Sequence, residues 1–292
     1  MSRTGMVSAL SLLLGGLAGG CAEDRPAAGD PPASDTAAST EAAAVAAAPA
    51  DLLASHELVD LTHAFDENTV YWPTSPSRFR LDTLSHGETE GGWFYSAFAI
   101  SAPEHGGTHL DAPVHFAEGG ATADEVELER LIGPAVVIDV STEAQQDRDF
   151  LLGRQHIEAW EAEHGRIPDG AIVLLRTGWD RFWPNARTYL GSDRAGDASD
   201  LHFPGFAPEA ARFLTESRAV SAVGIDAASI DHGPSRDFAA HRILAAAGVP
   251  ALENLARLNQ LPATGATLIA LPMKIGGGSG GPVRAVALVP RR

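Results

Sequence analysis

Large apolar residues recur throughout residues 55–292 but are almost absent from residues 22–54. Within the apolar part, short runs bounded by Gly, Pro, Asn or Asp are typical of β-strands, and apolar residues three or four positions apart are typical of helices. These patterns predict strands at 57–61, 94–101, 135–140, 171–177, 220–226, 267–274 and 283–289, and helices at 155–164, 208–217 and 237–247. Strands and helices follow one another in mixed order, so we expect a single domain of mixed α and β class.

The first 21 residues have the pattern of an export signal. Arg3 precedes an apolar run at 7–17, and small residues lead into Cys21, which is typical of a lipoprotein-type processing site. The run is too short for a transmembrane helix, which needs about 20 apolar residues. We therefore expect an exported protein, lipid-anchored through Cys21 to the bacterial cell envelope, in the periplasm or at the cell surface. An ordinary cleaved signal that leaves a free thiol is the alternative.

Residues 22–54 consist mainly of Ala, Pro, Ser, Thr, Asp and Glu. Such a segment cannot bury enough apolar surface to fold, so we interpret it as a disordered linker between the signal (1–21) and a catalytic domain at 55–292. The formal net charge of −17 argues against nucleic-acid binding, which needs clustered Lys and Arg. We expect a small-molecule substrate, and contact with a membrane only through the lipid anchor.

The segment 105–116 concentrates metal-ligand chemistry. It reads His-Gly-Gly-Thr-His-Leu-Asp-Ala-Pro-Val-His-Phe and contains the ligand-type residues His105, His109, Asp111 and His115. Imidazole and carboxylate groups without thiolates favour a Zn²⁺ or Mn²⁺ ion that acts on a substrate rather than one that only stabilises a fold. The alternative is a loop in which these side chains form ordinary hydrogen bonds.

Geometry requires this segment to bend. In a fully extended chain His105 and Asp111 would lie roughly 20 Å apart, too far to share one ion. Gly106 and Gly107 permit backbone angles that are closed to other residues. Pro113 prevents a regular strand from continuing beyond it. We therefore expect a bend at the glycines and no regular strand that continues to His115.

The motif resembles the signature His-x-Gly-Thr-His-x-Asp-x-Pro-x-His of the cyclase family, which includes bacterial kynurenine formamidases and isatin hydrolases. Other stretches similar to that family lie at 59–63, 176–179, 202–205, 224–231 and 276–284, so the likeness spans roughly residues 56–292. The resemblance implies a swivelling β/β/α architecture for the single catalytic domain. It also implies assembly as a homodimer or homotetramer.

Carried over by position, the resemblance implies metal ligation by five residues. They are His105, His109, Asp111, His241 and Glu253, with Asp111 able to bridge two ions. We therefore expect one or two Zn²⁺ or Mn²⁺ ions. From the residues alone, His241 would be an ordinary histidine on the surface of the helix at 237–247. The resemblance assigns His115 to catalysis, and a histidine beside a complete ligand set is suited to relay a proton.

A bound divalent metal lowers the pKa of its water from about 16 to about 7, which supplies hydroxide at neutral pH for attack on an amide carbonyl. We expect hydrolysis of a non-peptide C–N bond in a small aryl formamide, as in kynurenine formamidases and tryptophan catabolism. Trp72, Trp93 and Phe94 are candidate aromatic walls of the substrate site. The alternatives are a cyclic amide or lactone hydrolase similar to isatin hydrolase, and a lipoprotein that binds metal or ligand without turnover. An exported location favours a scavenging or detoxifying hydrolase.

Two glycine-rich motifs suggest other functions. Gly277-Gly-Ser-Gly-Gly281 fits the nucleophile elbow of serine hydrolases, but no Asp, Glu or His follows Ser279 to complete a triad. The same stretch fits a dinucleotide fingerprint, but a strand-like run follows it where that motif requires a helix. We interpret the stretch as a turn near the site. The aromatic-rich segment 179–206 is either a lid or subunit contact, or an irregular surface loop.

Overall fold

The computed structural model describes residues 52–291, which belong to one compact unit. The predicted signal (1–21), with Cys21, and nearly all of the predicted linker (22–54) lie outside the described residues. No helix in the described part combines the length and the apolarity needed to cross a bilayer. The elements, with η for a 3₁₀ helix, are β1 His56–Asp60, β2 Arg80–Glu88, β3 Phe94–Ser101, β4 His109–Asp111, η1 Pro113–His115, α2 Leu128–Leu131, β5 Ile132–Asp139, α3 Ser141–Gln146, β6 Leu151–Leu152, α4 Arg154–His164, β7 Ile172–Arg176, η2 Trp179–Phe182, α5 Ala186–Leu190, β8 Gly205–Phe206, α6 Pro208–Ser217, β9 Ala222–Ile225, α7 Ala239–Ala246, β10 Ala251–Glu253, η3 Leu258–Gln260, β11 Ala266–Pro272 and β12 Gly280–Pro290.

Seven strands of the described chain close into a barrel, in the order β12-β11-β5-β7-β9-β10-β4 with β4 paired back to β12. β12 is long enough to pair with different strands at its two ends. Residues 280–282 pair with β4 and residues 286–290 pair with β1, which adds a further strand at the edge. The neighbours β5, β7, β9 and β10 run parallel, whereas the pairs of β4, β11 and β12 are antiparallel.

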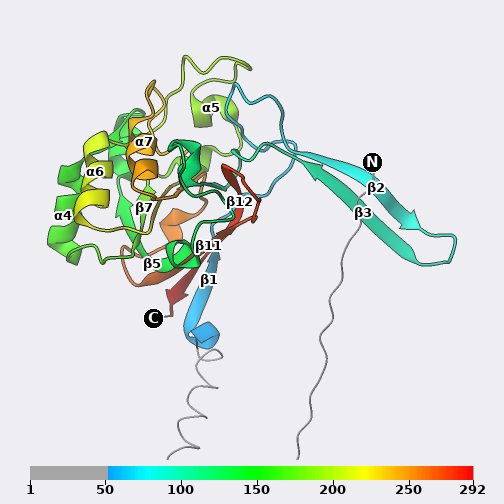
Figure 1. Cartoon of the computed structure of the whole chain (residues 1–292), viewed down its shortest axis with the longest axis horizontal. Coiled ribbons are helices and arrows are strands. Elements are labelled where there is room, and N and C mark those ends of the chain that lie inside the picture. Colours follow the sequence, from blue (N-terminus) through cyan, green and yellow to red (C-terminus); the bar gives the residue numbers. More distant parts are fainter. Residues whose placement is uncertain (1–51, 292) are drawn as a thin grey trace, which may run out of the picture. The chain divides into compact units, whose positions relative to one another are not determined.

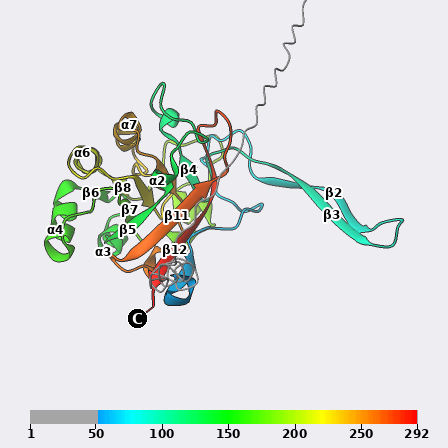
Figure 2. The same cartoon turned by 60° about the horizontal axis from the view of Figure 1, so that its bottom comes forward.

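Alternating side chains of the strands fill two separate cores. In β5 and β7, Val137 and Leu174 belong to the apolar cluster that fills the barrel. Their neighbours Ile138 and Leu175 point to the opposite face and pack with residues of α4, α6 and α7. These three helices lie together on one side of the sheet (Figures 1 and 2). Successive side chains of a strand point to opposite faces of the sheet. A central strand that is buried on both faces therefore has an uninterrupted run of apolar residues in the sequence.

β2 and β3 form a two-stranded antiparallel hairpin, residues 80–101, which we call the arm. The arm projects away from the barrel, on the side opposite to α4 and α6 (Figures 1 and 2). Most of its side chains are exposed within one copy of the chain. The segments at its base contribute Thr74, Ser75 and Pro76 on one side, and Pro103 and His105 on the other, to the lining of the cavity described below.

The predicted strands and helices are all present, with ends displaced by a few residues. β3 and α6 have the predicted bounds, and α6 begins at Pro208, a residue preorganised for the first helical position. The prediction missed β4 and β10, whose three residues are too short for a periodic pattern, and β2, whose sequence is largely polar. It also missed the short helices α2, α3 and α5 and the two-residue strands β6 and β8.

The segment 179–206 packs into the core at both ends, whereas most of residues 193–200 between them are exposed. It contains η2, α5 and β8, and Trp179, Tyr189 and Phe203 are fully buried within it. The Trp179 indole donates to the carbonyl of Tyr189 at 2.7 Å, which joins η2 to α5. Leu190, at the end of α5, lines the cavity described below.

Candidate metal centre

The segment 105–116 bends as the glycines predict. Gly106 and Gly107 have φ angles of +156° and +59°, and the chain then enters β4. At Gly106 an added Cβ would lie 2.1 Å from the ring of Tyr71, so a side chain is excluded on steric grounds as well. Pro113 ends the extended piece because it begins η1. The bend at the glycines and the interruption at Pro113 are thus confirmed, and the short strand β4 lies between them.

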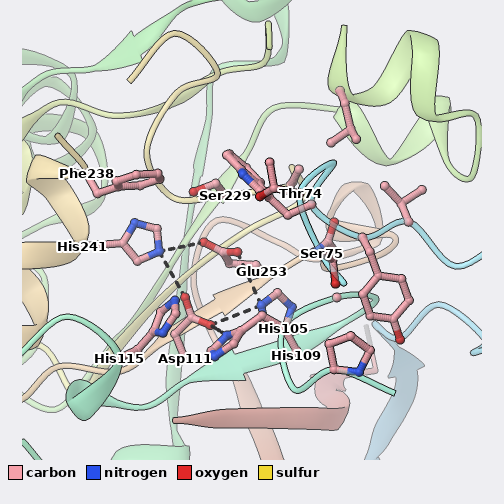
Figure 3. Close-up of a pocket in the computed structure, with 18 of the residues that line it drawn as sticks. Thr74, Ser75, His105, His109, Asp111, His115, Ser229, Phe238, His241 and Glu253 are labelled. Atoms are coloured by element: carbon pink, nitrogen blue, oxygen red, sulfur yellow. Dashed lines mark hydrogen bonds and ion pairs between the residues drawn. The ribbon is translucent and has the colours of Figure 1, made fainter. Parts of the chain in front are cut away.

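Barrel pairing and one helix bring the two distant candidate ligands to this segment. Glu253 lies directly opposite His109 in the antiparallel pair of β10 and β4. His241 lies in the first turn of α7 and is buried, although a surface position was the default for it. The five candidate ligands converge as predicted (Figure 3). Their role as ligands stays a prediction.

Asp111 is the centre of the cluster. His105 Nδ1 lies 2.7 Å and His109 Nε2 3.2 Å from its Oδ1, and His241 Nε2 lies 3.1 Å from its Oδ2. His241 Nε2 is also 3.1 Å from Glu253 Oε1, and His109 Nε2 is 3.6 Å from Glu253 Oε2. Two overlapping groups result, each with ligand atoms within 4.8 Å of one another: His105, His109 and Asp111, and Asp111, His241 and Glu253. A shared Asp111 is what two neighbouring ions would require.

The protonation of the rings supports a cation at this place. His109 Nδ1 lies 2.9 Å from the Gly107 carbonyl, to which only an N–H can donate. A neutral His109 therefore carries its lone pair on Nε2, which is buried and has no hydrogen-bond partner among the described residues. This lone pair faces the Asp111 and Glu253 carboxylates, an arrangement that becomes favourable when a cation lies between them. The donor set fits a divalent ion that accepts nitrogen and oxygen ligands.

The electrostatics of the cluster lead to the same conclusion. Burial alone would lower the pKa of His109, but the nearby carboxylates of Asp111 and Glu253 raise it to about 9. Burial likewise opposes protonation of His241, yet Asp111, Asp231 and Glu253 raise its pKa well above the usual value. Burial would raise the pKa of Asp111, but the three histidines hold it well below its usual range. The site therefore stabilises positive charge strongly.

Surrounding groups fix the orientation of two ligands. The Asp231 carboxylate accepts from His241 Nδ1 at 2.6 Å, which turns Nε2 toward the cluster. The Ile230 amide donates to Glu253 Oε1 at 2.8 Å. Such partners on the outer side of metal ligands set the tautomer and the direction of the lone pair.

His115 lies beside the cluster without joining either ligand group (Figure 3). It stacks on His105 with ring centroids 3.8 Å apart, and it lines the cavity. Burial is the main reason that its pKa is lowered to about 4, only partly offset by the charge of Asp111. The sequence suggested a value near that of free histidine. At neutral pH the ring is therefore uncharged.

A cavity of about 350 Å³ opens above the cluster. Of the three predicted aromatic wall residues, Trp72 lines it, but Trp93 and Phe94 do not. These two lie at the tip of the arm, 62% and 65% exposed, because the hairpin carries them away from the barrel. The prediction missed Tyr71 and Phe238. Phe238 could have been found from its spacing, since it precedes His241 by three positions at the start of the same helix.

A barrel that carries a buried cluster of imidazoles and carboxylates beneath a small open cavity defines a metal-dependent hydrolase. The chain belongs to the cyclase family: the family described as "Putative cyclase" matches residues 59–232. It is 37% identical over 249 residues to the isatin hydrolase of Roseibium aggregatum, covering 80% of this chain and 92% of the relative. It is 31% identical over 233 residues to the kynurenine formamidase of Salinibacter ruber, covering 78% of this chain and 96% of the relative.

The crystal structure of an isatin hydrolase bound to the product analogue thioisatinate is similar in fold, with a TM-score of 0.76 and 34% identity. The similarity covers 88% of this chain and 100% of that chain. The mixed α and β cyclase-like fold predicted from the sequence is thereby confirmed. The chain is a metal-dependent hydrolase of this family, and the proteins similar to it include an isatin hydrolase and a kynurenine formamidase.

Proposed function

We propose that the protein hydrolyses a C–N bond in a small, uncharged aromatic amide, with a cyclic amide such as isatin as the first candidate substrate. This choice of substrate rests on the residues that line the cavity. Apart from the metal cluster, its described lining is apolar or neutral, with Tyr71, Trp72 and Phe238 as aromatic walls. A flat aromatic ring fits such walls, and its carbonyl can reach the cluster at the floor.

An aryl formamide is the second candidate, and it was the first expectation from the sequence. The kynurenine formamidase of Salinibacter ruber supports it as a relative. N-Formylkynurenine, however, carries an ionised amino-acid group, and burying a charge is costly without a partner of opposite sign. Among the described residues, no Lys or Arg lines the cavity. This favours an uncharged substrate over an amino acid.

The residues of the site have different roles in the proposed reaction. A bound metal would lower the pKa of water and polarise the substrate carbonyl. His105, His109, Asp111, His241 and Glu253 would hold it, two of them positioned by Asp231 and the Ile230 amide. His115, uncharged at neutral pH, accepts a proton and returns it to the departing nitrogen, which cannot leave as an anion. The aromatic walls orient the ring and exclude bulk water.

The metal is Zn²⁺ or Mn²⁺ in this proposal. Three imidazoles and two carboxylates without a thiolate suit both ions, whereas Mg²⁺ and Ca²⁺ prefer oxygen ligands alone. The division of ligand atoms into two groups that share Asp111 supports a second ion beside the first.

Three substrates separate the two candidates. Isatin is cyclic and uncharged, formanilide is open-chain and uncharged, and N-formylkynurenine is open-chain and charged. Assays of the purified protein with Zn²⁺ or Mn²⁺ should give the highest kcat/KM for isatin and the lowest for N-formylkynurenine. A preference for N-formylkynurenine would refute the argument from the uncharged cavity. Turnover that survives chelation, or the change His109→Ala, would refute metal-dependent hydrolysis itself.

We further propose that the protein assembles with a second copy through the arm. Residues directly opposite in an antiparallel pair share a face, and the pairs Leu81 with Ile100 and Thr83 with Phe98 continue to Phe94 at the tip. Leu81, Phe94, Phe98 and Ile100 are 44–65% exposed. An isolated two-stranded hairpin is marginally stable in water, so we expect another protein surface to pack against this apolar face.

The size of the exposed apolar area supports a second copy of the chain as the surface that packs against the arm. Leu84 and Trp93 are also exposed on the arm. A large aromatic side chain buries about 150–250 Å², so covering the arm removes on the order of 800 Å², the share of one partner in a stable dimer. In a symmetric dimer both copies contribute the same surface to the interface. Because the base of the arm lines the cavity, such packing would also hold the cavity wall.

Phe98→Asp should therefore reduce the assembly to the monomer, or a tetramer to a lower state, in analytical ultracentrifugation. Tyr95→Asp is the matched control, because it replaces an exposed aromatic residue on the opposite face of the same strand. A parent protein that is monomeric at tens of micromolar would refute the assembly. An unchanged oligomer in Phe98→Asp would refute the role of the arm.

We propose export and lipid anchoring through Cys21, supported by the apolar run and the small residues before that cysteine. Expression of the full chain in bacteria should place it in the membrane fraction, and Cys21→Ser should release it or leave it unprocessed. Equal amounts of both proteins in the soluble periplasmic fraction would contradict the anchor and favour an ordinary cleaved signal.

A further inference from the structure

The glycine-rich turn that joins β11 to β12, residues 276–281, lies against the metal centre. Its serine contacts a metal-ligand candidate on one side and a carboxylate on the other. We propose that Glu104 and Ser279 form a relay that positions His105 as a metal ligand. The inference rests on the proposed metal-dependent function, and it gives these two residues a task that needs no contact with substrate.

Hydrogen-bond directions define the relay. The Ser279 hydroxyl donates to Glu104 Oε2 at 2.6 Å, because a carboxylate can only accept. The serine oxygen is then left to accept from His105 Nε2, 2.8 Å away. With its proton on Nε2, a neutral His105 carries the lone pair on Nδ1, which lies 2.7 Å from Asp111 Oδ1. Two acceptors at that distance attract only when a proton or a metal ion lies between them, so the relay leaves Nδ1 as the nitrogen that can bind a metal.

The backbone holds Ser279 in this place. Its amide donates to the same Glu104 oxygen at 3.0 Å, and its carbonyl accepts from the Ala112 amide at 2.9 Å. Both flanking glycines stand where a side chain would collide with the relay. An added Cβ would lie 2.7 Å from Glu104 Oε1 at Gly278, and 2.7 Å from the His105 ring at Gly280. The glycines therefore allow the turn to approach the metal centre closely.

His105 needs such support more than the other histidines do. Its side chain is 27% exposed, whereas those of His109 and His241 are 3% and 6% exposed. Packing holds the two buried rings, and each also donates through Nδ1, one to the Gly107 carbonyl and one to Asp231. The relay gives the more exposed ring an equivalent partner on its outer nitrogen. Partners of this kind typically change metal affinity by about 10- to 100-fold.

The test measures metal affinity rather than turnover. In the full chain, the dissociation constant for Zn²⁺ is obtained by competition with a chromophoric chelator for the parent, Ser279→Ala, Glu104→Gln and the double variant. Ser279→Ala should raise the constant about 10- to 100-fold. Because Glu104 acts through Ser279, the double variant should be no weaker than Ser279→Ala alone. Glu118→Gln, an exposed residue, controls for the loss of one negative charge.

The outcomes separate the relay from the function that it serves. A parent protein that binds neither Zn²⁺ nor Mn²⁺ overturns the proposed function. A parent that binds metal while Ser279→Ala binds it equally well overturns the relay alone. Additive losses in the double variant also overturn it, since Glu104 would then act independently. If Ser279→Ala does not fold, Glu104→Gln decides by itself: its constant must exceed that of Glu118→Gln.

Discussion

At the scale of single residues, four histidines line the same cavity but have different surroundings. His105, His109 and His241 each direct one ring nitrogen at the carboxylates of the cluster. His115 instead stacks on a neighbouring ring and remains outside both ligand groups. This difference separates the residues that would hold the metal from the residue that would move a proton.

Replacing His115 should abolish turnover and leave metal binding intact. His115→Ala removes a proton acceptor, and such groups typically contribute about 100- to 10,000-fold to the rate. We expect kcat to fall by at least about 100-fold, while the metal content of the purified protein is unchanged in elemental analysis. Loss of the metal in this variant would show that His115 is a ligand, and the role given to it here would be wrong.

His63 should make the stability depend on pH. It stacks on Trp183 with centroids 4.3 Å apart, and its Nε2 is buried without a partner in the region from 52 to 291. Burial is the largest cause that lowers its pKa to about 4, while Asp180 opposes the shift. A depressed histidine pKa contributes stability that is present above the unfolded value of about 6.5 and is lost as the pH falls toward 4.

Between pH 7.5 and pH 5 the loss from His63 should be about 2 kcal/mol in the free energy of unfolding. His63→Phe keeps an aromatic ring for the stack but cannot take up a proton. Urea unfolding of both proteins at the two pH values isolates the contribution, because other titrating groups are common to both. Equal pH dependence of parent and variant would mean that His63 does not titrate during unfolding.

At the scale of elements, the site depends on short pieces of structure whose ends are sharply defined. β4 has three residues, yet it carries His109 and Asp111, and pairs with both β10 and β12. The turn before it places His105 back over the same strand. These pieces have too little apolar surface to form by themselves, so the barrel that surrounds them determines their geometry.

Gly107→Ala tests how strongly the turn before β4 controls the site. Its φ of +59° costs a residue with a side chain about 1–2 kcal/mol, and the new Cβ would lie 2.6 Å from the ring of Phe65. We expect lower stability in urea unfolding and weaker Zn²⁺ binding. Gly119→Ala is the matched control, because Gly119 also has a left-handed φ of +74° but an added Cβ there meets nothing within 4 Å. Unchanged Zn²⁺ affinity in Gly107→Ala would contradict this account.

At the scale of the whole molecule, the candidate metal centre joins parts of the fold that are distant in the chain. The adjacent barrel strands β4 and β10 supply His109, Asp111 and Glu253, and α7 supplies His241 from the helical layer (Figure 3). An ion at this place would bind the folded chain alone, because the ligands separate when the chain unfolds. Metal binding and folding are therefore coupled.

Metal should raise the thermal stability of the protein. A ligand present at one hundred times its dissociation constant adds about 2.7 kcal/mol to the free energy of unfolding. For a domain of this size that corresponds to about 5–11 °C in Tm. Thermal unfolding followed by circular dichroism with Zn²⁺, with Mn²⁺ and after chelation measures the effect, and Mg²⁺ serves as the control ion. A Tm that responds equally to Mg²⁺ would contradict a site built on imidazole ligands.

The local parts of the fold could be predicted because their signals are local. Long apolar runs gave the central strands, and Pro208 with its amphipathic run gave α6. Gly106, Gly107 and Pro113 fixed the turn and the end of β4, since these residue types restrict the backbone wherever they occur. The motif of 105–115 identified the first half of the site in the same way.

The remaining features required contacts between distant residues. His241 and Glu253 were named by family resemblance, but only the pairing of β10 with β4 and the docking of α7 bring them to Asp111, 130 residues away from His241. The contact of Ser279 with His105 and the exposed position of Trp93 and Phe94 were equally invisible to a periodic pattern. The sequence by itself determined which segments become strands, helices and turns, and which residue types can bind a metal. The tertiary structure alone decided which of them meet, because closing the barrel sets distances that no local preference encodes.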